Sequence, residues 1–170
     1  MSVVANIAAF LPEVARRKPN APAVIFPEGR DAQGRVSYTH YTYAQLDADS
    51  DLIARGLAAM GLKKGSRTVL MVTPGLDFFA LTFGIFKLGA VPVMIDPGMG
   101  VKKLKQCLQE SQPDAFIGVT KAHVARLVLR WPAGALKVTV GKKLFWGGVT
   151  LDEVRAAGAG YKDDLPSTSE

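Results

Sequence analysis

The chain has 170 residues, 48% of them hydrophobic, and this composition indicates one globular domain with a substantial core rather than a disordered chain. No run approaches the roughly 18 apolar residues that a membrane-spanning helix needs, and the N-terminus lacks the features of a secretory signal. The net charge of +6 comes from small scattered groups of Lys and Arg, which favours a solvated surface over one that binds an anionic cofactor or a nucleic acid.

The N-terminal part of the chain predicts a helix followed by a hairpin. Apolar residues at helical spacing indicate the helix, and they are Val4, Ile7, Leu11 and Val14. Pro12 should bend or restart this helix, because proline lacks a backbone N–H and its ring clashes with the preceding turn. Residues 23–26 and 36–39 flank a turn-rich stretch and are typical of a β-hairpin at the edge of a sheet.

A longer amphipathic helix is predicted at residues 43–60. Thr42 and Gln45 have the spacing of a capping box, in which each side chain binds a free backbone N–H at the start of the helix. Gly61 can adopt the left-handed conformation that ends a helix. The expected buried stripe consists of Leu46, Ile53, Leu57 and Met60.

The middle of the chain alternates short apolar runs with segments of helical periodicity. The runs have the length and continuous hydrophobicity of strands covered on both faces, and they lie at residues 68–72, 91–95, 115–119 and 136–140. The apolar positions of the helices between them are Leu76, Phe79, Phe83 and Phe86, then Leu104, Cys107 and Leu108, and finally Val124, Leu127 and Val128. Repeated strand–helix–strand units predict parallel strands joined by right-handed crossovers. We therefore expect an α/β fold, a mainly parallel sheet flanked by helices, with an N-terminal helix and an edge hairpin.

The last part of the chain departs from this pattern. A short helix is predicted at residues 151–157, and residues 158–170 are small and polar, which is typical of a linker or a cut end. We therefore expect residues 1–157 to form one α/β subdomain and residues 158–170 to lead into further sequence.

Familiar catalytic and phosphate-binding motifs are absent from the sequence. It contains no G-x-x-x-x-G-K-[ST] loop, no complete G-x-G-x-x-G and no G-x-S-x-G elbow. Two histidines and one cysteine are too few for a zinc-type cluster. The segment 96–100, Asp-Pro-Gly-Met-Gly, lies between a predicted strand and a helix, where backbone N–H groups can bind an anion. Its composition favours a plain tight turn, with the anion site as the alternative.

Single reactive side chains do not form a catalytic set. Cys107, the one cysteine, excludes an intrachain disulfide, favours a reduced, cytoplasmic setting and is expected to be a buried structural thiol. His123 is expected to be solvated at a helix start, and His40 to lie at a strand edge without a partner for general-base catalysis. Four phenylalanines are expected to be core rather than an acyl pocket, although a helix facing the sheet could serve both: Phe78, Phe79, Phe83 and Phe86.

Three segments of the chain resemble the AMP-forming adenylating enzymes, the superfamily of acyl-CoA synthetases, peptide-synthetase adenylation domains and luciferases. Residues 43–46 are similar to an early L-T-Y-x-E-L motif. Residues 86–97, FKLGAVPVMIDP, are similar to the family's L-K-x-G-A-x-x-V-P-I-D-P, and residues 65–72 resemble its G-D-x-V-x-x strand. The resemblance covers about residues 7–140.

A narrower resemblance points to one bacterial subgroup of this superfamily. Residues 104–108, 112–118 and 146–151 are similar to the proteins of long-chain olefin biosynthesis, whose members use ATP to turn β-hydroxy acids into β-lactones. The resemblance implies an N-terminal fragment of an AMP-forming ligase that lacks the nucleotide-binding part. The family's Pro-Lys-Gly loop, its aromatic-Gly-x-Thr-Glu segment, its ribose-binding Asp and its C-terminal Lys have no counterparts here, so we carry over no catalytic, cofactor-binding or metal-binding residue.

The implied function of the parent is to activate a fatty or β-hydroxy fatty acid as an acyl-adenylate, using ATP and Mg²⁺. The acyl group would then pass to CoA, to a carrier thiol or to the β-hydroxyl of the substrate. The fragment alone is expected to be inactive, to bind none of these cofactors, and to contact the remainder of its polypeptide or self-associate through an exposed docking face. The alternative is a self-contained, non-catalytic α/β module that binds a protein partner or a small anion.

Overall fold

The computed structural model describes residues 6–95, 98 and 100–165. In chain order its elements are η1, a 3-10 helix (Ile7–Ala9), α1 (Phe10–Arg17), β1 (Pro22–Arg30), β2 (Val36–Thr42), α2 (Tyr43–Ala59), β3 (Arg67–Met71), α3 (Leu76–Lys87), β4 (Val91–Val93), α4 (Val101–Ser111), β5 (Ala115–Val119), α5 (Thr120–Leu129), β6 (Leu136–Val140), β7 (Val149–Thr150) and α6 (Leu151–Gly160). The two-residue β7 was not predicted, because so short a strand shows no periodicity. Helix α6 continues beyond the predicted end at Ala157.

Five parallel strands form one sheet in the order β4-β3-β5-β6-β7. The prediction of an α/β fold with a mainly parallel sheet is therefore confirmed. β5 lies in the middle of the sheet, where Ala115 pairs with Thr68 of β3 and with Leu136 of β6. β4 is shorter than predicted and is not covered on both faces, because it is an edge strand paired with β3 alone and its Val91 is exposed.

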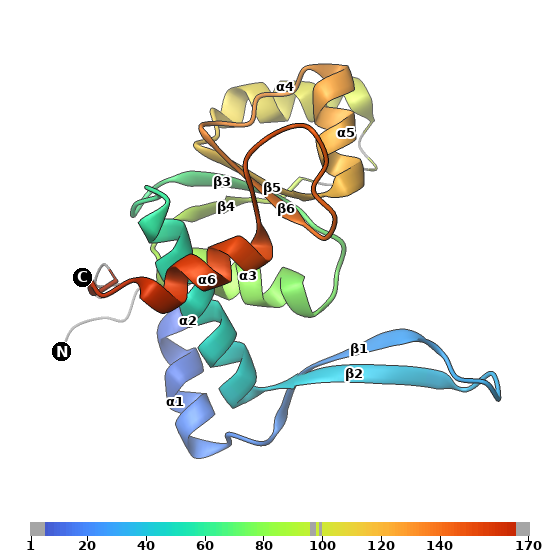
Figure 1. The fold of residues 1–170 in the computed structure, drawn as a ribbon, viewed down its shortest axis with the longest axis vertical. Coiled ribbons are helices and arrows are strands. Elements are labelled where there is room, and N and C mark those ends of the chain that lie inside the picture. Colours follow the sequence, from blue (N-terminus) through green and yellow to red (C-terminus); the bar gives the residue numbers. More distant parts are fainter. Residues whose placement is uncertain (1–5, 96–97, 99, 166–170) are drawn as a thin grey trace.

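Helices cover both faces of the sheet, as Figure 1 shows. On one face α2, α3 and α6 enclose the larger core, in which Ile53 and Val154 are fully buried against Ile117 of β5. On the other face α4 and α5 enclose a second core around Leu108 and Phe116. Successive strand side chains point to opposite faces, which is why the neighbours Phe116 and Ile117 belong to different cores.

Helix α2 begins as predicted and ends at Ala59, one residue before the predicted end. The Gln45 backbone N–H donates to Thr42 Oγ1 at 3.2 Å, and the Thr42 N–H donates to Gln45 Oε1 at 2.9 Å, which completes the capping box. Gly61 follows the helix with a φ of +93°. Three members of the predicted stripe are buried and the fourth, Met60, is partly buried; the three are Leu46, Ile53 and Leu57.

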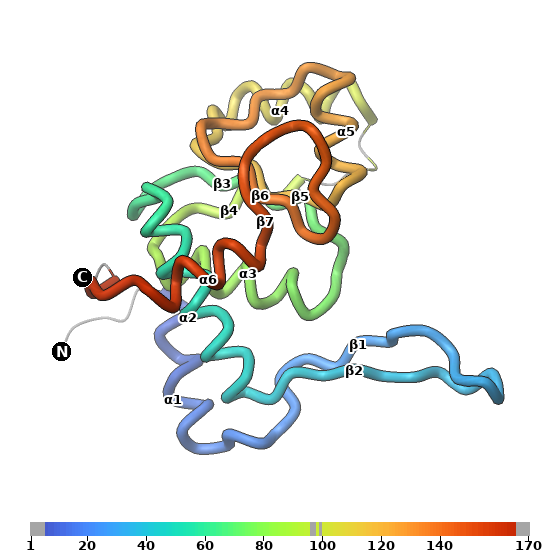
Figure 2. The backbone as a smooth tube through the Cα atoms, viewed as in Figure 1, coloured from blue at the N-terminus to red at the C-terminus, as the bar shows by residue number. Residues whose placement is uncertain are grey.

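Two glycines allow α6 to cross α2 at very short range. A Cβ atom added at Gly56 would lie 1.9 Å from the Val154 carbonyl oxygen, and one added at Gly158 would lie 1.9 Å from the Leu52 carbonyl oxygen. No side chain fits either position unless the backbones move apart. The contact therefore fixes α6 on α2, and the tube in Figure 2 shows the two segments crossing.

The hairpin forms as predicted but not in the predicted place. β1 and β2 are antiparallel, with Ile25 opposite His40, yet they make a separate two-stranded sheet rather than the edge of the main one. Figures 1 and 2 show the ribbon of β1 and β2 extending away from the five-stranded sheet. Thr42, the last residue of β2, is also the N-cap of α2, so the chain passes from the hairpin directly into a helix on the face of the sheet.

The N-terminal helix restarts at Phe10, where η1 gives way to α1. Pro12 lies in the first turn of α1, where a missing backbone N–H costs nothing because it has no helical acceptor. Leu11 is buried and Ile7 is exposed, so the predicted apolar stripe holds only in part. Val4 lies outside the described residues.

The predicted buried face of α5 is wrong, and that of α3 is right only in part. In α3, Leu76 and Phe83 are partly buried against the larger core, but the large side chains that are fully buried are Leu81 and Ile85, and Phe79 is 37% exposed. The small Ala80 and Gly84 lie on the same side as these residues and bring α3 close to α2, and the larger aromatic rings are displaced from the contact. In α5 the predicted apolar residues are exposed, and they are Val124, Leu127 and Val128.

Candidate functional site at the carboxyl edge of the sheet

The direction in which the chain crosses the sheet changes between β3 and β5. From β3 the chain moves to β4 on one side, and from β4 it returns past β3 to β5 on the other side. The two connecting helices, α3 and α4, consequently pack on opposite faces. In open α/β sheets such a switch point leaves a crevice outside the carboxyl ends of the strands, and ligands bind there. The ends of β3 and β5 are therefore the candidate site.

An apolar cavity of about 670 Å³ lies at this edge. The usual volume of a small-molecule site is roughly 300–1,000 Å³, so the cavity is large enough for a ligand. Its lining comes from strand ends, from the loop after β3 and from helices on both faces: Leu70, Met71, Val72, Thr73, Pro74, Phe78, Met94, Ile95, Leu104, Val119, Lys121, Ala122, Ala125 and Trp131.

The walls of this cavity follow from the packing of the two helical layers. Ala122 and Ala125 lie one turn apart on α5, and their small side chains leave space that a larger residue would fill. Phe78 lines the cavity from α3 on the opposite face of the sheet. Trp131 is 7% exposed, and its indole N–H has no hydrogen-bond partner among the described residues. Lys121 is exposed and is the only charged side chain among the described residues of the lining.

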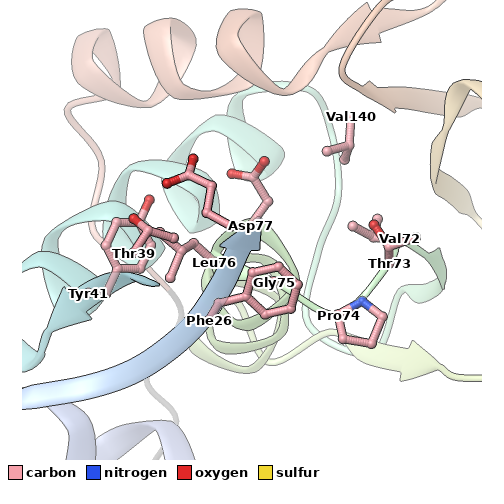
Figure 3. Close-up of a pocket in the computed structure, with 11 residues that line it drawn as sticks. Phe26, Thr39, Tyr41, Val72, Thr73, Pro74, Gly75, Leu76, Asp77 and Val140 are labelled. Atoms are coloured by element: carbon pink, nitrogen blue, oxygen red, sulfur yellow. The ribbon is translucent and has the colours of Figure 1, made fainter. Parts of the chain in front are cut away.

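A smaller and more polar pocket, of about 360 Å³, lies on the other side of the loop after β3. Figure 3 shows the loop residues Pro74 and Gly75 beside the ring of Phe26, with Tyr41 and Asp77 on the hairpin side. Glu28 also lines this pocket, so its charged groups are acidic. An acidic lining does not suit a phosphate or a carboxylate, since like charges repel.

Asp77, one of the two acidic residues that line this pocket, belongs to an ion network centred on Arg155. The Arg155 guanidinium binds Asp49 through two hydrogen bonds of 2.7 and 2.8 Å, and it binds Asp77 at 2.7 Å. The Tyr41 hydroxyl donates to Asp49 at 3.0 Å. Burial, together with the Asp49 carboxylate, raises the pKa of Tyr41 to about 12. Hydrogen bonds to Asp49 hold the pKa of Arg155 above its ordinary value. The network joins β2, α2, α3 and α6. The carboxylates of Asp49 and Asp77 therefore have a structural role.

His123 is fully buried, and the prediction that it is solvated is wrong. Its Nε2–H donates to the Val138 carbonyl oxygen at 2.9 Å, and its ring stacks on Trp146 with centroids 5.2 Å apart. Burial lowers the pKa of His123, and the nearby Arg126 and Lys137 lower it further, against the effect of the Val138 hydrogen bond. The imidazole is a neutral core group. Sequence spacing does not reveal this, because its partners come from β6 and from the loop after it.

The other candidate residues do not converge on the cavity. His40 is exposed on β2, and Cys107 is half-buried rather than buried, since Leu104 and Leu108 occupy the centre of the α4 contact. Within the segment 96–100, Asp96, Pro97 and Met99 lie outside the described residues, so the predicted tight turn and its alternative, an anion site, are both untested.

The longest matched motif builds scaffold in the structure. Lys87 is 7% exposed and its ammonium group binds Asp47 and Asp51 of α2, both at 2.6 Å. Gly89 turns the chain from α3 into β4 with a φ of +70°. These contacts position the end of β4, and with it Met94, at the mouth of the cavity. Their role is structural, because they consist of an ion pair and a turn.

The phenylalanines of α3 divide between core and cavity. Phe78 and Phe83 pack against the larger core, and Phe78 also lines the apolar cavity. Among the four phenylalanines, Phe78 alone both packs against this core and lines the cavity, and an acyl pocket there stays a prediction. Among the described residues, no three His, Cys, Asp or Glu side chains are grouped to hold a metal ion. Within those same ranges no helix is long and apolar enough to cross a membrane.

The sequence model of the AMP-binding enzymes matches residues 11–147 of the chain. The chain belongs to this family. It is 55% identical over 157 residues to an olefin β-lactone synthetase of Stenotrophomonas maltophilia, a match that covers 91% of the chain and 28% of that protein. It is 50% identical over 171 residues to an olefin β-lactone synthetase of Xanthomonas campestris, covering 99% of the chain and 31% of that protein. This AMP-binding family member thus spans less than a third of the length of these two relatives.

Solved structures of adenylating enzymes share the fold of this family member. The anthranilate CoA ligase AuaEII, solved with anthranoyl-AMP, superposes with a TM-score of 0.75 at 19% identity over 89% of the chain and 28% of that protein. The adenylation domain of a Mycobacterium chelonae carboxylate reductase superposes with a TM-score of 0.77 at 17% identity over 96% of the chain and 30% of that domain. At these identities the likeness establishes the fold alone.

Proposed function

We propose that this chain is the N-terminal part of an ATP-dependent, AMP-forming ligase that activates a β-hydroxy fatty acid. The observation that carries the proposal is the 50–55% identity to two olefin β-lactone synthetases across nearly the whole chain. The carboxylate oxygen of the acid would attack the α-phosphorus of ATP, which forms an acyl-adenylate and releases pyrophosphate. The β-hydroxyl would then lose its proton to a base in the rest of the polypeptide while its oxygen attacks the acyl carbon, so that AMP leaves and a β-lactone forms. CoA or a carrier thiol would be the alternative acceptor of the acyl group, in place of the β-hydroxyl.

Within that enzyme this chain would supply scaffold and one wall of the substrate site. The cavity lies outside the carboxyl ends of β3 and β5, and its lining is almost wholly apolar. Because the described residues contain no group of three His, Cys, Asp or Glu side chains that could hold a metal ion, we derive no catalytic step from a metal bound to them. The donors that stabilise charge on the transferring phosphorus would come from the rest of the polypeptide, and the chain alone is then inactive. A division into an N-terminal subdomain and a connecting stretch, in a cytoplasmic protein, remains part of this proposal, with the boundary after Gly160 instead of after residue 157, because Gly158 packs on α2 within α6.

The test compares this chain with the longer protein encoded by the same reading frame. ATP-dependent pyrophosphate release is measured with β-hydroxystearic acid, stearic acid and no acid. We expect release only from the longer protein, with preference for the β-hydroxy acid and a β-lactone as the product detected by mass spectrometry. Release without lactone would indicate CoA or a carrier as acceptor. Release by this chain alone, or by neither protein, would contradict the proposed function.

A further inference from the structure

We propose that the outer face of α5, together with the loop of residues 141–148 between β6 and β7, binds the surface of a membrane that contains anionic lipids. The proposal goes beyond the function proposed above and does not depend on it. It rests on a cluster of exposed apolar side chains, on the positive charge around that cluster and on the lack of acidic residues in this part of the chain.

The outer face of α5 carries apolar residues that reach neither core. Val124 is three residues from Leu127 and four from Val128, so the three side chains lie on one side of the helix. They are 42%, 38% and 74% exposed, respectively. A surface helix normally carries polar residues on the side that faces away from the core. The opposite side of α5 already packs on the second core, through Ala122 and Ala125. The exposed valines and leucine are therefore not needed to hold α5 on the sheet.

The loop between β6 and β7 adds a phenylalanine to this surface. Phe145 is 83% exposed. The loop is attached to the start of α5, because the Thr120 hydroxyl donates to the Lys142 carbonyl oxygen at 2.6 Å and the Trp146 ring stacks on that of His123. The Phe145 ring lies 5.7 Å from the Trp146 ring, between centroids. Figures 1 and 2 show the loop beside α5, so the helix and the loop form one apolar surface.

Positive charge is concentrated in the same part of the chain. Residues 120–150 contain six Lys and Arg residues and no Asp or Glu, whereas the whole chain has 21 basic and 15 acidic residues. The net charge of +6 therefore arises in this segment alone, and the charges of the other residues balance. Lys121 and Arg130, at the two ends of α5, and Lys142 of the loop are exposed. Basic groups thus surround the apolar cluster, and no acidic residue of the segment neutralises them.

This combination of side chains selects a lipid surface over other macromolecules. Interfaces between proteins are depleted of Lys, which is abundant here. Nucleic acids bind to surfaces on which bases stack against aromatic rings, and exposed Val and Leu side chains give no such stacking. An anionic membrane meets both requirements, because its headgroups attract Lys and Arg while the boundary of its acyl region accepts Phe, Val and Leu side chains.

The test measures how the full-length protein sediments with lipid vesicles. One set of vesicles contains phosphatidylcholine alone, and the other contains about one third phosphatidylglycerol, which is anionic. We expect the protein to bind the anionic vesicles and not the neutral ones. Binding should weaken as the salt concentration rises, because salt screens the attraction between exposed Lys or Arg groups and the headgroups.

Three substitutions test the surface, and two others serve as matched controls. Phe145→Ser and Val128→Ser should each weaken binding about tenfold, since each removes a side chain that lipids would bury. Lys142→Gln should weaken binding about fivefold, the effect of one basic residue near an anionic surface. Ile25→Ser, at a residue 62% exposed on the hairpin, and Lys18→Gln, at the exposed end of α1, should change nothing. Figure 1 shows that the hairpin and α1 lie on the opposite side of the sheet from α5.

Several outcomes would overturn the proposal. One is a wild-type protein that stays in solution with anionic vesicles at low salt, and another is equal binding to neutral vesicles. Unchanged binding of Phe145→Ser and Val128→Ser would also contradict it. The substituted side chains are exposed, so the variants should melt at the temperature of the wild type. A lower melting temperature of the double variant, or its change from an oligomer to a monomer, would show that another segment or a second copy covers this surface instead of a membrane. Pyrophosphate release enters none of these outcomes, so the proposed function is tested separately.

Discussion

The five-stranded sheet with its helices and the β1–β2 hairpin bury their side chains in different ways. In the sheet, helices of this chain cover both faces, and residues such as Phe116 and Ile117 are fully buried. In the hairpin one face packs against the part of the chain that the structure describes, and the other face is largely exposed to solvent. Val24 lies in the larger core, whereas its neighbour Ile25 and the nearby Tyr38 are each 62% exposed. A two-stranded ribbon of this kind has little stability of its own. The sheet is therefore packed on both faces by helices of this chain, whereas the hairpin depends on its attachment to α2 and α3.

The largest loss of stability should follow substitution of Gly158, because this residue lies at the close contact between α6 and α2, two helices that cover the sheet. Gly158→Val places a side chain where a Cβ atom would already lie 1.9 Å from the Leu52 carbonyl oxygen. We expect a loss of about 4 kcal/mol in the free energy of unfolding, measured by urea denaturation. Gly160→Val is the matched control on the same helix, since nothing lies within 4 Å of a Cβ there. A loss below about 1 kcal/mol for Gly158→Val would show that the contact between α6 and α2 does not require glycine at this position.

The Arg155 network should give the next largest effect, because it connects the hairpin with the helices. Arg155→Met leaves the Asp49 carboxylate, which is 14% exposed, without its bidentate partner. Breaking a fully buried pair costs roughly 3–5 kcal/mol, and partial exposure reduces our expectation to about 2 kcal/mol. Adding Asp49→Asn to the variant should recover part of this loss, and the double-mutant cycle measures the coupling. Arg55→Met, on the exposed side of α2, should change stability by less than about 0.5 kcal/mol.

Acid should destabilise the second core through His123. The pKa of His123 is lowered in the folded protein, so the unfolded chain binds more protons once the pH falls below the ordinary value of 6.5. Its contribution is complete above that value and is lost progressively as the pH falls through the lowered pKa. His123→Gln removes the titrating imidazole and its stacking on Trp146, and it should cost about 1 kcal/mol near neutral pH. It should also flatten the pH dependence. Equal slopes of unfolding free energy against pH for the two proteins would contradict this account.

Local sequence patterns predicted most helices and strands well, because such patterns depend only on residues that are neighbours in the sequence. The capping box of Thr42 and Gln45 and the continuous apolar run of β5 are properties of a few consecutive residues, and both occur as expected. The position of the hairpin and the buried faces of α3 and α5 depend on distant partners. His123 is buried because it forms a hydrogen bond with Val138 and stacks on Trp146. No spacing of residues in the sequence indicates these contacts.

The candidate site was harder to predict than the fold for the same reason. The cavity unites Phe78, Leu104 and Trp131, which come from separate segments, and its existence depends on the order of the strands. Parallel strands were predictable from the strand–helix alternation, but the return of the chain past β3 to β5 was not. The resemblance to adenylating enzymes indicated the family without indicating the cavity, because the matched motifs form the scaffold around it.

The smallest effect should come from the outer face of the hairpin, and this prediction tests the comparison most directly. Ile25 and Tyr38 lie on adjacent strands and are exposed, so the double variant Ile25→Thr and Tyr38→Thr should change the unfolding free energy of this chain by less than about 0.5 kcal/mol. Val24→Thr, one residue away on the inner face, buries a hydroxyl group and should cost about 1–2 kcal/mol. Equal losses for the two faces would mean that the hairpin does not pack on the body through one face. The same double variant in the full-length protein extends the comparison, because a larger loss there would show that the rest of the polypeptide covers the face that this chain leaves exposed.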